Sequence, residues 1–155
     1  CDDLFKTKLA KLLWLVDFGH FRLQRVSVTG LAYSRLPHGP APDRFQILLG
    51  ILEEAGAIRL SERTAGPYIG EVIESLLDRP SLDGFTESEL YVIETIMDHY
   101  GHFNSDQLSD LSHKERVWQD REDGELISYL EADHVHMRSR VTLQSYRSHR
   151  TDAVA

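Results

Sequence analysis

The stretch Phe5-Lys-Thr-Lys-Leu-Ala-Lys-Leu-Leu-Trp-Leu-Val-Asp-Phe-Gly-His-Phe-Arg-Leu23 decides the fold of this chain. Its apolar residues recur at spacings of three and four, which predicts a helix, and they occupy most sides of that helix. A helix that is apolar nearly all round belongs in the core of a domain. Asp17 and His20 interrupt this pattern, and because they are three residues apart their side chains are neighbours on the helix surface.

A buried carboxylate needs partners, since an unpaired charge in a core costs several kcal/mol. We expect the segment after the helix to supply these partners in a polar knot made of Asp17, His20, Thr29, Gly30 and Tyr33. The alternative is an acid–base pair in which Asp17 orients the imidazole of His20 for proton transfer. That pair would still need a nucleophile, and the chain has neither a G-x-S-x-G motif nor an internal cysteine.

The rest of the chain predicts an α+β fold that is mainly α-helical, a compact helical domain with a small β-hairpin or short sheet. Further helices are expected at 43–55, 86–100 and 105–111, with another short one capped by Ser112. Strands are expected at 57–62 and 68–73, which form the hairpin, and a brief extended segment at 26–33. Three prolines make 36–42 a rigid loop, with Pro42 suited to the first turn of the next helix.

The start of the third helix is predicted by Thr86 and Glu89, which have the spacing of a capping box. Its buried face is expected to contain Leu90, Ile93, Ile96 and Met97. Ser105 is the expected N-cap of the helix that follows.

Charge is distributed unevenly along the chain, whose net charge is −8. Residues 83–133 hold 14 acidic and 3 basic side chains, a balance of −11, whereas residues 1–82 balance to zero. An acidic surface repels phosphate backbones, so we expect no direct nucleic-acid binding through this domain. Such a surface would instead attract a basic partner protein.

The length predicts one domain at residues 1–133, followed by a basic C-terminal tail at 134–155 that is peripheral or mobile. The chain begins at Cys1 without a methionine, which is compatible with a missing upstream domain. Neither an apolar run of ~18 residues nor a signal-peptide pattern occurs. With a single cysteine and no membrane signal, we expect a cytoplasmic protein that does not associate with membranes.

The eight histidines suggest a metal site at only three places. These are the groups Asp98, His99 and His102, then Glu131 and His134, and finally His134 and His136. A metal site needs about three or four converging ligands, and the chain has no HExxH motif, no paired Glu-x-x-His and no cysteine pair. We therefore expect no metal and no cofactor, and we interpret these residues as helix-end or surface histidines.

Short motifs follow one another along the chain in a fixed order. They are Leu12-Leu-Trp-Leu-Val-Asp-Phe-Gly-His20, Val28-Thr-Gly-Leu-Ala-Tyr33, Leu36-Pro-His-Gly-Pro40, Phe85-Thr-Glu-Ser-Glu-Leu90, Tyr100-Gly-His102, Leu108-Ser-Asp-Leu-Ser-His113 with Trp118, and Gly124-Glu-Leu-Ile127. In this order they resemble the Panacea domain, the family of SocA-like antitoxins and phage-associated proteins. The resemblance covers about Leu4 to Ala132. It implies a compact, mainly helical domain that binds and neutralises a partner toxin of a bacterial or phage toxin–antitoxin pair.

Two functions stay open at this point, and an enzymatic one through Asp17 and His20 is poorly supported. The first is a non-enzymatic, antitoxin-like interaction domain that uses the 35–44 loop, the acidic region 83–125 or both. The candidate partner-binding residues are Arg35, His38, Gly39, Pro40, His113 and Trp118. The second is the effector or dimerisation domain of a DNA-binding transcriptional regulator, because some members of the family carry a helix-turn-helix upstream. A homodimer is compatible with both.

Overall fold

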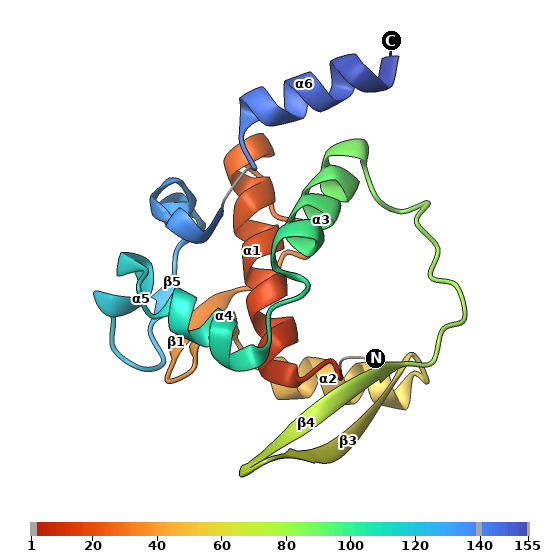
Figure 1. The fold of residues 1–155 in the computed structure, drawn as a ribbon, viewed down its shortest axis with the longest axis vertical. Helices are drawn as coiled ribbons and strands as arrows, with labels where there is room; N and C mark the ends of the chain where they lie inside the picture. The colour runs from red at the N-terminus through yellow and green to blue at the C-terminus, as the bar shows by residue number, and fades with distance from the viewer. Residues whose placement is uncertain (1–2, 139–140, 155) are drawn as a thin grey trace.

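The computed structural model describes residues 3–138 and 141–154. Helices surround a central helix, and two small antiparallel sheets lie beside them (Figure 1). In chain order the elements are α1 (Lys6–Gln24), β1 (Tyr33–Leu36), β2 (Gly39–Pro42), α2 (Phe45–Glu54), β3 (Ile58–Ala65), β4 (Tyr68–Ser75), α3 (Glu87–Tyr100), α4 (Ser105–Ser112), α5 (Arg116–Gln119), β5 (Leu126–Ile127), the 3₁₀ helices η1 (Tyr129–His134) and η2 (His136–Arg138), and α6 (Leu143–Val154). The predicted α+β, mainly helical fold is confirmed.

Helix α1 is the core of the domain. Its side chains Trp14, Leu15 and Phe18 are almost completely buried. Helices α3 and α4, strand β2 and the 3₁₀ helix η1 all contact it, as its central position in Figure 1 indicates. Because neighbours surround it, α1 requires apolar residues on nearly every side, which is the pattern found in its sequence. Within the described residues, no helix is both long and apolar enough to cross a membrane.

The three-stranded sheet has the order β2-β1-β5, with all neighbours antiparallel. The prediction of a rigid loop at 36–42 is wrong, because β1 and β2 form a tight hairpin there. Pro42 pairs with Tyr33 in the sheet instead of starting a helix, and α2 begins at Phe45. Prolines are tolerated in β2 because it is an edge strand. The extended segment expected at 26–33 becomes a strand only at Tyr33.

The predicted β3–β4 hairpin is confirmed, and its strands extend to 58–65 and 68–75. It forms a separate two-stranded sheet rather than pairing with the 26–33 segment. Strand β4 is attached to the start of the chain through a bridge between Phe5 and Val72 and a 2.9 Å bond from Ile73 N to Leu4 O. The other end extends away from the helices (Figure 1).

The capping box of α3 is confirmed, since Thr86 Oγ1 accepts from Glu89 N at 3.2 Å and the Glu89 carboxylate accepts from Thr86 N at 2.9 Å. The predicted buried face is confirmed at Ile96 but otherwise differs from the observed one. The observed face holds Ser88, Val92, Ile96 and Tyr100, while Met97 is 46% exposed and Leu90 and Ile93 are half-buried. A Cβ on Gly19 of α1 would lie 3.4 Å from Val92 Cγ1, so the glycine lets this face come close.

The caps of the two short helices also differ from the prediction. Asn104, rather than Ser105, is the N-cap of α4, and it forms a capping box with Gln107. Ser112 does not cap α5 but is buried at the end of α4. Both serines follow or precede other polar residues, so spacing alone could not tell which one takes the cap.

Residues after 133 contribute to the core, so the expectation of a peripheral tail is wrong for them. Val135, Met137, Val141 and Tyr146 are buried in the same cluster as α1. Glu115 holds this segment, because its carboxylate accepts from the backbone N–H groups of His136 at 2.9 Å and of Met137 at 2.5 Å. Most of α6 remains exposed, and it lies at the end opposite the β3–β4 hairpin (Figure 1). The domain boundary at residue 133 stays a prediction.

Candidate partner-binding site

Asp17 is completely buried and is surrounded by hydrogen-bond donors from the segment after α1. Its Oδ1 accepts from Val28 N at 2.9 Å and Thr29 N at 2.8 Å. Its Oδ2 accepts from Thr29 Oγ1 and from Tyr33 OH, each at 2.5 Å. Burial and the nearby charge of Asp17 raise the pKa of Tyr33 far above its usual range, so the phenol keeps the proton that it donates. One carboxylate thus fixes the chain from 28 to the start of β1.

His20 belongs to a different set of contacts. Its Nδ1 lies 2.6 Å from Val26 O and its Nε2 lies 2.9 Å from Ser88 Oγ, so it ties α1 to α3 as well as to the following loop. Gly30 has φ +73° and donates its N–H to Ser27 Oγ at 3.0 Å. The structure therefore brings Asp17 together with Thr29 and Tyr33, and it places His20 and Gly30 beside this group with other partners. None of these hydrogen bonds joins Asp17 to His20.

The β1–β2 hairpin is anchored on α1 by a residue that sequence reasoning missed. Lys11 is 1% exposed, and its Nζ donates to Pro40 O at 2.9 Å. Burial lowers the pKa of Lys11 to about 7. Gly39 sits directly above this contact with φ +109°, and a Cβ there would lie 2.2 Å from Ser112 Oγ and 2.5 Å from Lys11 Cε. Only glycine suits that conformation and that space.

Three of the candidate partner-binding residues form a stack beside the hairpin, here called the hairpin cluster: Arg35, His113 and Trp118. The guanidinium carbon of Arg35 lies 4.0 Å from the centroid of the Trp118 ring. The His113 ring stacks on the same ring, with centroids 4.2 Å apart and planes 27° apart. All three side chains are half-buried. The structure thus assembles residues from β1, the end of α4 and α5 into one surface.

Hydrogen bonds to the hairpin backbone fix this stack. Trp118 Nε1 donates to Leu36 O at 2.8 Å, and His113 Nε2 lies 2.9 Å from Pro37 O. The other candidates lie close by in the chain but differ in exposure. His38 is exposed at the turn, whereas Gly39 and Pro40 are buried against α1 and α4. Gly39 and Pro40 therefore support the surface from beneath, and the assignment of His38, Gly39 and Pro40 as partner-binding residues stays a prediction.

The acidic segment 120–125 is held next to the hairpin cluster. Arg35 forms an ion pair with Asp123, and its carbonyl accepts from Gly124 N at 2.7 Å. The exposed acidic residues of this segment, here called the acidic rim, are Asp120, Glu122, Asp123 and Glu125. The rim and the cluster together form a surface in which a tryptophan and an arginine are bordered by carboxylates.

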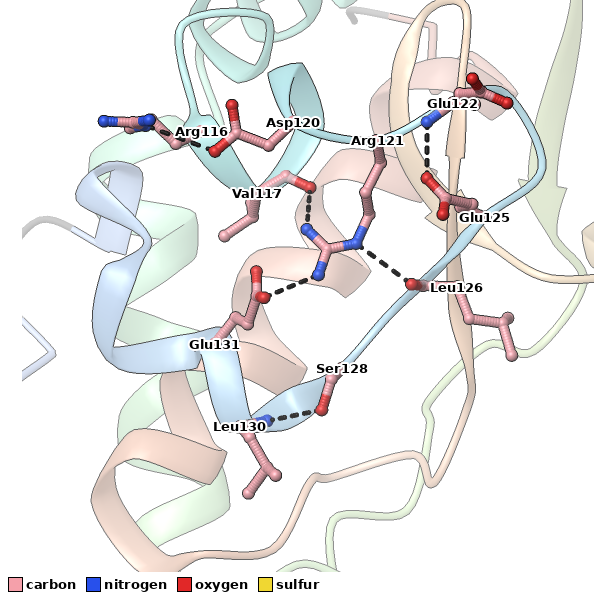
Figure 2. A network of polar contacts seen from close by, with 10 residues as sticks. All are labelled: Arg116, Val117, Asp120, Arg121, Glu122, Glu125, Leu126, Ser128, Leu130 and Glu131. Carbon is pink, nitrogen blue, oxygen red and sulfur yellow. Dashed lines mark hydrogen bonds and ion pairs between the residues drawn. The ribbon is translucent and has the colours of Figure 1, made fainter.

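Arg121 keeps the rim in place from below, as Figure 2 shows. Its guanidinium donates to Val117 O at 2.7 Å, to Leu126 O at 3.2 Å and to the Glu131 carboxylate at 2.7 Å. The hydrogen bond to Glu131 raises the pKa of Arg121. Through these bonds the arginine joins α5 to β5 and η1.

None of the metal-site candidates converges in the part of the chain that the structure describes, where no three His, Cys, Asp or Glu side chains are placed to hold an ion. His99 packs edge-on against Tyr100, and the rings of His102 and Phe103 are in contact. The Nδ1 of His136 lies 3.4 Å from the carboxylate of Glu115, which is otherwise engaged with the backbone.

Comparison with known proteins identifies the family. The family model described as "Antitoxin SocA-like, Panacea domain" matches residues 9–119. These residues include most of α1, the knot around Asp17, the β1–β2 hairpin and all three members of the hairpin cluster. No curated protein and no solved structure matches the chain. Because the family model covers well over half of the chain, this protein belongs to the antitoxin SocA-like, Panacea domain family.

Proposed function

We propose that this domain neutralises a protein toxin by binding it through the hairpin cluster and the acidic rim. Membership of an antitoxin-like family supports a role of this kind. The observation that carries the choice of surface is that Arg35 and His113 both pack against the ring of Trp118. Tryptophan and arginine are enriched among the residues that dominate binding energies at protein interfaces.

The side chains of this surface are already held in place, which favours binding. Trp118 is already held by a bond to Leu36 O, and Arg35 by its ion pair with Asp123. Side chains that are fixed before binding lose less conformational entropy when a partner arrives. The proposed surface therefore needs little rearrangement to form a complex.

The charge of the surface points to a basic toxin. Within the acidic rim Asp123 pairs with Arg35 and Asp120 pairs with Arg116, and Glu122 and Glu125 add two further exposed carboxylates, in a chain whose net charge is −8. Complementary charge accelerates association and helps to exclude wrong partners. In the proposed mechanism the antitoxin supplies no chemistry: it covers the active surface of the toxin.

Co-expression with the product of a neighbouring gene tests the proposal. We expect this product to be toxic when expressed alone, to be neutralised by the domain and to co-purify with it. Trp118→Ala should abolish both neutralisation and co-purification, whereas Tyr68→Ala, which removes a half-exposed aromatic ring on β4, should leave both intact. If no neighbouring product is neutralised, the antitoxin function is wrong. If Trp118→Ala still neutralises, the function stands but the surface is wrong.

Other predictions from the sequence are not decided by these contacts. The effector or dimerisation domain of a DNA-binding regulator, a homodimer and a cytoplasmic location all stay predictions. They do not conflict with toxin binding, and the co-expression experiment does not depend on them.

A further inference from the structure

A cavity of about 460 Å³ lies between the first half of α1, the β1–β2 hairpin and the start of α2. It is separate from the hairpin cluster, whose members do not line it. Much of its wall is apolar and is formed by Ala10, Leu36, Pro37, Ala41, Pro42 and Phe45. Cavities of this size and lining accept small organic ligands, which are oriented by a few polar groups.

The charged groups of this cavity are mainly cationic. Lys6, Lys11 and Arg44 line it, against one carboxylate, that of Asp43. Lys6 already lies 4.0 Å from the carboxylate of Glu71. Lys11 and Arg44 are different, because neither has an ion pair among residues 3–138 and 141–154.

Lys11 is the more informative of these two cations. It is 1% exposed, and the one acceptor that its ammonium group contacts in the described chain is the neutral Pro40 O. A buried charge is normally paired, because leaving it unpaired is costly. The lowered pKa of Lys11 is the expected result of burial without a counter-charge.

The start of α2 adds positive potential to the same cavity. Arg44 is its N-cap, with φ +55°, and no side chain caps the helix. Phe45 and Gln46, the first helical residues, both line the cavity. The first N–H groups of a helix lack partners within the helix, and its dipole favours an anion there.

We propose that this cavity binds a carboxylate that carries a short apolar group. The carboxylate pairs with Lys11 and Arg44 at the start of α2, and the apolar group contacts Phe45 and the prolines of the hairpin. Two sources present this chemistry: a free organic acid, and the C-terminal residue of a peptide chain that ends in an apolar side chain. The inference does not rest on toxin neutralisation, and it concerns a different part of the surface.

Titrations monitored by amide chemical shifts test the proposal with three probes. N-acetyl-leucine represents a chain end, octanoate represents a free acid, and N-acetyl-leucine amide has the same apolar group without the charge. For molecules of this size we expect a Kd in the millimolar range for a carboxylate probe. The shifts should be confined to amides around the cavity, and the amide probe should bind at least about tenfold more weakly.

Variants identify the groups that hold the carboxylate. Lys11→Met keeps the length of the side chain, and Arg44→Gln changes an exposed residue, so the second variant remains informative if the first unfolds. Each should weaken a carboxylate probe by about tenfold, which is the effect of losing ~1.4 kcal/mol of binding energy. Arg59→Gln, an exposed residue of β3 that does not line the cavity, is the matched control and should have no effect.

The outcomes separate clearly. Tighter binding of N-acetyl-leucine indicates a chain end as the ligand, and tighter binding of octanoate indicates a free acid; both support the proposal. It is overturned if neither carboxylate shifts the cavity amides, if the uncharged amide binds equally well, or if Arg44→Gln leaves the affinity unchanged.

Discussion

Replacing Asp17 by alanine should destabilise this protein more than any other single loss of a polar group in α1. The substitution removes the acceptor of four hydrogen bonds, at 2.9, 2.8, 2.5 and 2.5 Å, and leaves the donors of Val28, Thr29 and Tyr33 unpaired around a buried cavity. Removing one side of a buried charged contact costs about 3–5 kcal/mol. Since a domain of this kind is stable by roughly 5–15 kcal/mol, this is a large fraction of the total.

Urea denaturation followed by tryptophan fluorescence measures this loss, because Trp14 is completely buried in the core. The midpoint should fall while the slope with urea stays the same, which indicates a change in stability without a change in the unfolded state. Asp98→Ala, which removes an exposed carboxylate from α3, is the matched control and should stay within about 0.5 kcal/mol of the wild type.

A double-mutant cycle with Tyr33→Phe shows whether the effect runs through the knot. Tyr33 OH donates to Asp17 Oδ2, so the tyrosine substitution should cost about 1.5–3 kcal/mol when Asp17 is present and much less in Asp17→Ala. Additive losses, or a loss below about 1 kcal/mol for Asp17→Ala, would refute the reasoning that the carboxylate fixes the segment after α1.

Three other predictions follow from the contacts around the hairpin and the last segment. Burial lowers the pKa of Lys11 from 10.5 to about 7, so between these pH values the unfolded chain binds more protons than the folded one, and the free energy of unfolding should rise with pH by up to about 5 kcal/mol. Lys11→Met should flatten this rise in urea midpoints measured from about pH 6 to about pH 10. A variant with the same pH profile as the wild type would contradict the prediction. Gly39→Ala should lower thermal stability more than Gly56→Ala. Both positions have a positive φ, which costs an alanine about 1 kcal/mol or more, but only at Gly39 would the added Cβ also overlap neighbouring atoms. Equal losses would exclude this overlap. Glu115→Gln should destabilise by about 1.5–3 kcal/mol and accelerate hydrogen exchange of the 136–137 amides, and unaltered protection there would show that this carboxylate does not anchor the segment.

Several parts of the fold could be read from local patterns. The apolar residues of α1 recur at helical spacing, Thr86 and Glu89 form the capping box that their spacing indicates, and β3 and β4 pair as a hairpin. Helix periodicity, capping and hairpin turns depend on residues close together in the chain, so a sequence expresses them directly. The same reasoning placed Thr29 and Tyr33 as partners of Asp17, because they follow α1 without a long connection, but it missed the N–H group of Val28.

Sequence patterns were misleading wherever burial depends on distant parts of the chain. The prolines at 37, 40 and 42 suggested a loop, yet the edge position of β2 accommodates the last two in a strand. Lys11 looks like Lys6 in the sequence, and only its position under β2 and α4 makes it an almost completely buried cation. The segment after residue 133 looked too polar for the core, but a few apolar side chains are sufficient to fill it.

By itself, the sequence determined the family and the central helix, because the motifs and the apolar period of α1 lie in short continuous stretches. It also marked Arg35, His113 and Trp118 as candidates, although one at a time. Only the tertiary structure brought Arg35 to 4.0 Å and His113 to 4.2 Å from the ring of Trp118. It also formed the cavity lined by cationic side chains next to the start of α2. The physical reason is that stacking, burial and unpaired charge are properties of residues far apart in the chain. They exist only after the backbone has brought those residues together.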